Sequence, residues 1–192
     1  MDRPEVRQIP AEVPDVPIDD LEFRSLFERE VSYVWNSLRR LGVREGDLPD
    51  QTQEVFVTVH AILDDYDRSR PLRPWLFGIA YRTASHYRRL ARNAREVPAG
   101  AHGGAALTDS APLADDQLAH AEDQDLALRA LAEVDLPRRS VLVLADIDGV
   151  PVPEIARAFD LPLNTAYSRL RLAREDFAAA AKRLRARQRG PR

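Results

Sequence analysis

One short stretch of the chain concentrates side chains that suit DNA. They are hydroxyls, guanidinium groups and one exposed leucine, namely Thr165, Ser168, Arg169, Arg171, Leu172 and Arg174. Hydroxyls and arginines hydrogen-bond base edges and phosphates, and a leucine can contact the methyl group of thymine. The residue types therefore predict a surface that binds duplex DNA.

A helix-turn-helix pattern over residues 152–170 positions this cluster. Ile155, Ala156 and Phe159 form the inner side of a short helix, and the small Ala156 permits a close crossing. Asp160 stands where the chain must turn, and it tolerates a left-handed backbone better than most residues. Pro162 blocks continuation of the first helix. This arrangement places a second helix in the major groove.

The second helix is expected to be capped by Asn164 or Thr165. Its inner face is predicted from the helical period around Leu170, and it comprises Ala166, Leu170, Ala173 and Phe177. The alternative is an ordinary helical hairpin with solvated arginines. The turn, the cap and the small crossing residue together favour DNA binding over that alternative.

Enzymatic motifs are missing from the sequence. The chain has no cysteine and four scattered histidines, and it lacks a nucleophile elbow, a phosphate-binding glycine loop and an HExxH motif. The acidic pairs Asp64–Asp65 and Asp115–Asp116 are simplest as solvated loop charges. We expect no enzyme activity, no catalytic residue, no metal and no cofactor.

The charge distribution agrees with a DNA-binding protein although the net charge is only −3. Residues 21–95 carry 13 basic and 10 acidic residues, and residues 126–192 carry 13 basic and eight acidic ones. Residues 96–125 hold seven acidic residues and no lysine or arginine. Basic folded parts with an acidic tether fit a protein whose non-specific DNA affinity is held down.

The elements that carry these residues are predicted to be helical throughout. Residues 1–18 are acidic and proline-rich and are predicted to be disordered. Apolar residues then recur at helical spacing over residues 19–41, 49–63 and 72–95, with Gly42 as a helix stop.

A flexible acidic linker is predicted over residues 96–124 because it combines Gly, Ala, Pro and acidic residues without periodicity. Helices are expected again at about 125–134, 137–146, 152–159 and 165–187. The fold class is therefore all-α, with two small helical domains at 19–95 and 125–187.

The N-terminus lacks a signal-peptide pattern, and no apolar run approaches the ~20 residues of a membrane span. We therefore expect a soluble cytoplasmic protein and no membrane contact.

The C-terminal half resembles a known family. The segment from Asp135 to Ala156, continued by Leu161-Pro-Leu-Asn-Thr-Ala-Tyr-Ser-Arg-Leu-Arg-Leu-Ala-Arg, is similar to region 4 of extracytoplasmic-function sigma factors. The resemblance implies that the helix-turn-helix recognises the minus-35 promoter element.

The N-terminal half resembles region 2 of the same family. Asp50-Gln-Thr-Gln-Glu-Val-Phe is similar to the segment that docks on core RNA polymerase, which implies polymerase contacts at Asp50, Gln53, Glu54 and Phe56. The segment Tyr66–Ala80 and the following helix resemble the part that melts and recognises the minus-10 element. The residues to which this role transfers are Arg68, Arg70, Arg73, Trp75, Arg82, His86 and Arg89.

Trp75 is more simply a core residue than a stacking surface for a base. Departures from the family pattern stand at Gln51, Thr52, Arg82, His86, Tyr167 and Leu172. They put the usual promoter consensus in doubt and leave the scaffold unaffected.

The resemblance implies a sigma factor that directs transcription initiation. Its implied partners are core RNA polymerase, promoter DNA and an anti-sigma protein, and the free chain is expected to be a monomer. The alternative is a helix-turn-helix regulator that binds DNA without acting as a sigma subunit. The polymerase-docking motif at residues 50–56 argues against that alternative.

Overall fold

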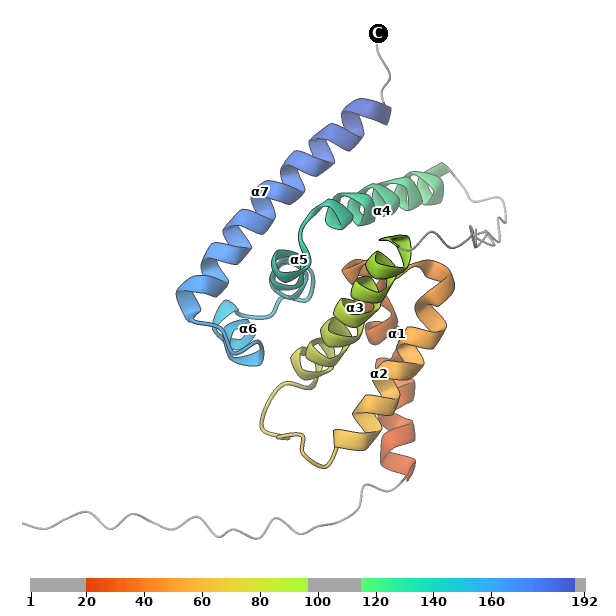
Figure 1. Cartoon of the computed structure of the whole chain (residues 1–192), viewed down its shortest axis with the longest axis vertical. Coiled ribbons are helices and arrows are strands. Elements are labelled where there is room, and N and C mark those ends of the chain that lie inside the picture. The colour runs from red at the N-terminus through yellow and green to blue at the C-terminus, as the bar shows by residue number, and fades with distance from the viewer. Residues whose placement is uncertain (1–19, 97–114, 189–192) are drawn as a thin grey trace, which may run out of the picture.

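The computed structural model describes residues 20–96 and 115–188, and every regular element in these ranges is helical (Figure 1). The prediction of an all-α fold is confirmed. Residues 1–18, which we expect to be disordered, lie outside the described residues. So do residues 97–114 of the predicted linker and residues 189–192.

Three long helices form the N-terminal unit, residues 20–96. They are α1 (Asp20–Leu41), α2 (Leu48–Ile62) and α3 (Leu72–Glu96), and each packs against the other two. A single 3-10 turn (Glu45–Asp47) joins α1 to α2. The inner faces carry large apolar side chains at helical spacing, including Val34, Leu38, Leu41, Leu48, Val55, Val59, Leu76, Phe77 and Ile79.

Four helices form the C-terminal unit, residues 115–188. They are α4 (Asp115–Glu133), α5 (Leu136–Leu142), α6 (Val152–Ala158) and α7 (Leu163–Gln188). The long α7 contacts α4, α5 and α6. Residues Val143–Ile147 continue α5 as a π-helical turn, in which the N–H of Asp148 donates to the carbonyl of Val143 at 3.0 Å.

Two helix starts in the C-terminal unit differ from the prediction. α4 begins at Asp115 and not at about residue 125, so the predicted linker is too long at its C-terminal end. Residues 115–124 contain no Gly or Pro, and the acidic residues at their start interact favourably with the helix dipole. α7 begins at Leu163, because the carbonyl of Pro162 accepts the N–H groups of Thr165 (2.9 Å) and Ala166 (3.1 Å). The predicted cap at Asn164 or Thr165 is therefore wrong.

Two helices end in the same left-handed turn. After α1, Gly42 has φ 93°, its N–H donates to the carbonyl of Arg39, and the N–H of Val43 donates to the carbonyl of Leu38. After α6, Asp160 has φ 50°, its N–H donates to the carbonyl of Arg157, and the N–H of Leu161 donates to the carbonyl of Ala156. Both are Schellman motifs. The predictions of a helix stop at Gly42 and of a left-handed Asp160 are confirmed.

The two units share one continuous hydrophobic core. Arg139 of α5 is fully buried at the contact. Its guanidinium donates to the carbonyls of Ala132 (2.7 Å) and Val134 (2.8 Å) at the end of α4 and of Leu41 (3.0 Å) at the end of α1. Burial, followed by repulsion from Arg88, lowers the pKa of Arg139 to about 10. The side chain is still a cation at neutral pH, and it joins the C-terminal ends of two helices from different units.

Replacing Gly42 by alanine is expected to destabilise the protein by about 1–3 kcal/mol, because an L-residue is strained at φ 93°. The new Cβ would also lie 2.6 Å from a nitrogen of Arg139 and 2.8 Å from one of Arg88. The free energy of unfolding in urea measures the effect. Gly46→Ala is the matched control, since nothing lies within 4 Å of a Cβ at Gly46. Equal stability of the two variants would contradict the strain at Gly42.

Candidate functional site

The helix-turn-helix of the C-terminal unit has the geometry that the sequence predicts. Ile155 and Ala156 of α6 are buried against α7, and the turn passes through the left-handed Asp160. On α7 the buried residues are Ala166, Leu170, Ala173, Ala180 and Leu184, whereas Phe177 is half-buried. The opposite side of the first half of α7 is open.

The structure divides the predicted minus-35 residues into two groups. Ser168, Arg171 and Arg174 are exposed. Thr165, Arg169 and Leu172 are half-buried. The exposed side of α7 is therefore rotated slightly from the predicted face.

Two further exposed residues of α7, which are not among the predicted minus-35 residues, belong to this face. Tyr167 is 52% exposed and Asn164 is exposed one turn before Ser168. The helical spacing from Asn164 through Tyr167 and Ser168 to Arg171 places all four on one stripe. The helix start at Leu163 brings Asn164, one of the two residues predicted as the cap, onto this stripe.

Two exposed arginines of α7 form ion pairs with carboxylates. Arg171 pairs with Glu175 at 2.7 Å, and Arg174 makes two hydrogen bonds to Asp146 at 2.6 and 2.9 Å. These pairs are solvent-exposed, so each contributes little to stability and the arginines can exchange the carboxylate for a phosphate.

The loop between α2 and α3 and the first turn of α3 present arginines in the same way. Arg68, Arg70 and Arg73 are all exposed, and they pair with Glu22, Asp67 and Glu30 at 3.0, 3.1 and 3.1 Å. Ser69 donates its hydroxyl and its N–H to Asp67 at 2.6 and 3.0 Å, which lowers the pKa of that carboxyl group. The loop is thus ordered by its own hydrogen bonds and presents cations outward.

Trp75 lies at the start of α3 beside Tyr66, with ring centroids 4.7 Å apart. Both rings are half-buried against the core, and burial raises the pKa of Tyr66. Further along α3, Arg82, His86 and Arg89 are exposed at spacings of four and three residues, so they lie on one face of the helix. The predicted minus-10 residues therefore lie in two groups: one at the loop and the first turn of α3, and one further along α3, on about the opposite side of the helix from Arg73.

Two of the four predicted polymerase-binding residues, Gln53 and Phe56, line an apolar groove between α1 and α2. The groove has a volume of about 560 Å³, and its lining includes Phe56 and Gln53 together with Phe23, Phe27, Val31, Trp35, Pro49, Thr52, Val57 and His60. The ring of Phe56 is buried at the base of the groove and lies 4.7 Å from that of Phe27. Asp50 and Glu54 are exposed on the same helix.

Phe27 follows the helical spacing of the apolar residues of α1, and the structure leaves it 38% exposed at the groove. Val57 is 58% exposed beside it. Exposed apolar side chains next to two carboxylates give a surface with an apolar centre and an acidic rim, which is typical of a protein-binding site.

Within residues 20–96 and 115–188, histidine and carboxylate side chains nowhere gather in a group of three that can hold a metal ion. In the same ranges no helix combines the length and apolar character that a membrane span requires.

Comparison with known proteins matches both units in order. The family model described as Sigma-70 region 2 matches residues 26–94, and that described as Sigma-70, region 4 matches residues 124–177. The RNA polymerase sigma factor CnrH of Cupriavidus metallidurans is 30% identical over 165 residues, which cover 82% of this chain and 85% of that protein. The ECF RNA polymerase sigma-E factor of Escherichia coli is 29% identical over 143 residues, covering 69% and 73%.

Solved structures agree on the fold. CnrH in complex with the cytosolic domain of CnrY has a TM-score of 0.59 and 26% identity, and the match covers 84% of this chain and 88% of that one. The sigma factor RpoE of Bartonella quintana, in complex with the anti-sigma factor NepR, has the same TM-score with 18% identity, covering 84% and 97%. The second likeness bears on the fold alone.

Thr52 lines the groove, and its hydroxyl is buried without a hydrogen-bond partner. Thr52→Val is therefore expected to stabilise the protein by about 1 kcal/mol, because it removes an unsatisfied polar group at constant shape. Urea unfolding measures the change. Thr58→Val, which removes a hydroxyl that donates to the carbonyl of Glu54 at 3.0 Å, should not stabilise. Stabilisation by both variants alike, or by neither, would contradict the assignment.

Proposed function

We propose that three surfaces of this chain bind its partners. The chain belongs to the extracytoplasmic-function sigma factors of the sigma-70 family. It is an RNA polymerase sigma factor, which directs transcription initiation by binding core polymerase and recognising promoter DNA. The observation that carries this function is the presence of region 2 and region 4 in order in one chain. A helix-turn-helix regulator alone would not require region 2.

In this proposal the C-terminal unit, with residues 125–187 as its functional part, contacts the minus-35 element. The exposed stripe of α7 enters the major groove, where Ser168 and Arg171 face base edges and Arg174 faces a phosphate. Thr165, Arg169 and Leu172 flank the stripe. The exposure of Ser168 and Arg171 supports the assignment.

The N-terminal unit, with residues 19–95 as its functional part, contacts the minus-10 element. Arg68, Arg70 and Arg73 supply positive charge for a separated strand, and Arg82, His86 and Arg89 form a second exposed group on α3. Cations and aromatic surfaces bind single strands without chemistry. The half-buried Trp75 acts mainly by supporting the loop.

The groove between α1 and α2 is the proposed docking site for core polymerase. Phe56 and its apolar neighbours would receive a partner's apolar side chains, while Asp50, Gln53 and Glu54 would meet polar or basic groups at the rim. The exposure of Phe27 and Val57 supports an occupant of this kind.

The chain itself catalyses no reaction in this proposal, and it works in the cytoplasm beside polymerase. An anti-sigma protein binds it, a proposal that the CnrH–CnrY complex motivates.

Glu54→Ala is expected to weaken binding to bacterial core polymerase about tenfold or more, because an exposed carboxylate at the rim of the docking groove is lost. Fluorescence titration of core polymerase measures the affinity, and circular dichroism confirms the fold. Glu122→Ala, an exposed glutamate on α4, is the matched control and should bind normally. Normal assembly of the Glu54 variant would remove that residue from the docking site.

Arg171→Ala is expected to weaken promoter binding by about 1–3 kcal/mol and to relax the sequence preference at one minus-35 position. The measurement is the affinity of the holoenzyme for promoter fragments selected from random DNA by the unaltered holoenzyme. Arg185→Ala, an exposed arginine near the other end of α7, should change affinity much less. An unchanged preference in the Arg171 variant would exclude it from base recognition.

A further inference from the structure

The helix-turn-helix of α6 and α7 packs against α3, which carries part of the proposed minus-10 surface. The ring of Phe159, at the end of α6, meets the rings of Phe77 and Tyr81 of α3 edge-on, with centroids 6.3 and 5.2 Å apart. Burial raises the pKa of Tyr81, and the nearby charge of Arg169 on α7 opposes that rise. The N-terminal part of α7 therefore lies close to α3.

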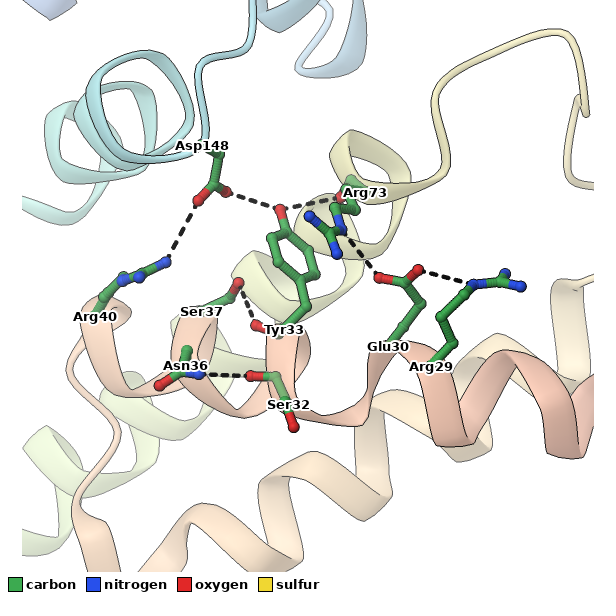
Figure 2. Close-up of polar contacts among 9 residues, drawn as sticks. All are labelled: Arg29, Glu30, Ser32, Tyr33, Asn36, Ser37, Arg40, Arg73 and Asp148. Atoms are coloured by element: carbon green, nitrogen blue, oxygen red, sulfur yellow. Dashed lines mark hydrogen bonds and ion pairs between the residues drawn. The ribbon is translucent and has the colours of Figure 1, made fainter.

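Asp148 reinforces this contact with charged hydrogen bonds between the units (Figure 2). It follows the π-helical turn, and its carboxylate accepts the hydroxyl of Tyr33 at 2.8 Å and a nitrogen of Arg40 at 3.3 Å, both from α1. The Asp148 side chain is only 9% exposed. A carboxylate buried to this degree is stable only while its partners remain.

Tyr33 connects this carboxylate to Arg73 in the first turn of α3. The guanidinium of Arg73 lies over the Tyr33 ring at 5.0 Å from its centroid, and Arg73 also pairs with Glu30 at 3.1 Å. Figure 2 shows the sequence of contacts from Asp148 through Tyr33 to Arg73 and Glu30. A residue of the C-terminal unit thus helps to hold an arginine of the proposed minus-10 surface.

The contact is incompatible with simultaneous recognition of both promoter elements. Elements centred near positions −35 and −10 are separated by about 25 base pairs, on the order of 80 Å of duplex at 3.4 Å per base pair. In the structure, the turn that precedes α7 touches α3 through Phe159 and Phe77. The two recognition surfaces must therefore move apart before both can bind.

We propose that Asp148, Tyr33 and Arg40 form a latch that holds the free chain closed, and that the latch opens when the chain binds core polymerase. Only the opening on core polymerase rests on the proposed sigma function; the closed state of the free chain does not. The apolar contact at Phe159 and the Arg139–Leu41 hydrogen bond close the same interface, so the latch variants weaken the closed state without removing its core.

The distance between the units can be measured in the full chain, because it contains no cysteine. Glu45→Cys and Lys182→Cys place a donor and an acceptor dye at exposed positions in the two units. Single-molecule energy transfer should find the free chain mostly at one short distance. Addition of bacterial core polymerase should shift it to a long distance.

Three variants of the labelled chain test the latch itself. Asp148→Ala should increase the open population at least about tenfold, because it leaves Tyr33 and Arg40 without their partner. Tyr33→Phe is the milder second variant, since it removes only one hydroxyl, and should give a smaller increase. Asp146→Ala is the matched control: Asp146 lies two residues away and pairs with Arg174 inside the C-terminal unit, so the distance should not change.

Binding to polymerase gives an independent readout. If only the open chain binds, the apparent affinity of Asp148→Ala for core polymerase should rise by the factor by which its open population rises. A long distance in the free unaltered chain, an unchanged distance in both latch variants, or a short distance in the polymerase complex would each overturn the latch. Absence of polymerase binding would overturn the proposed function and the opening step together, and it would leave the closed state standing, because the closed state is measured without polymerase.

Discussion

The buried cation of Arg139 is the constraint on which the arrangement of the two units depends. Its hydrogen-bond partners are main-chain carbonyls at the ends of α4 and α1, where helix dipoles supply partial negative charge. A buried cation that loses its partners costs several kcal/mol. The ends of α4 and α1 are therefore held close together, and Gly42 leaves the space that the guanidinium occupies.

Most helices were predictable because their buried residues recur at helical spacing, and Asp160 was predictable because few residues tolerate its turn. The first ten residues of α4 were missed since acidic and alanine-rich sequence has little periodicity. Arg139 was not predictable: a charged residue in a helical pattern is ordinarily solvated, and its partners lie on two other segments. Phe27 fits the apolar period of α1, and only the packing of α2 shows that its ring remains open to a partner.

The candidate site shows the same division. Residue types predicted the proposed minus-35 and minus-10 surfaces, but the exposed stripe of α7 is rotated from the predicted face, because Thr165, Arg169 and Leu172 on one flank are half-buried and Arg169 lies near Tyr81 of α3. The sequence also gave no indication that the arginines of both surfaces pair with carboxylates in the free chain. Such pairs keep guanidinium groups extended and reduce attraction to arbitrary DNA, while a phosphate in the right place can replace the carboxylate.

The π-helical turn at Val143–Ile147 can also be considered in evolutionary terms. A π turn accommodates one residue more than an α-helical turn. A relative shorter by one residue here would continue as a regular α-helix, and four α-helical residues turn the chain through nearly the same angle as the five residues of the π turn. The residue in the place of Asp148 would therefore keep its direction toward Tyr33 and Arg40. Whether a lineage closes its units in this way would thus depend on which side chain stands at that place, and a gained or lost residue in the preceding turn would leave the contact in register.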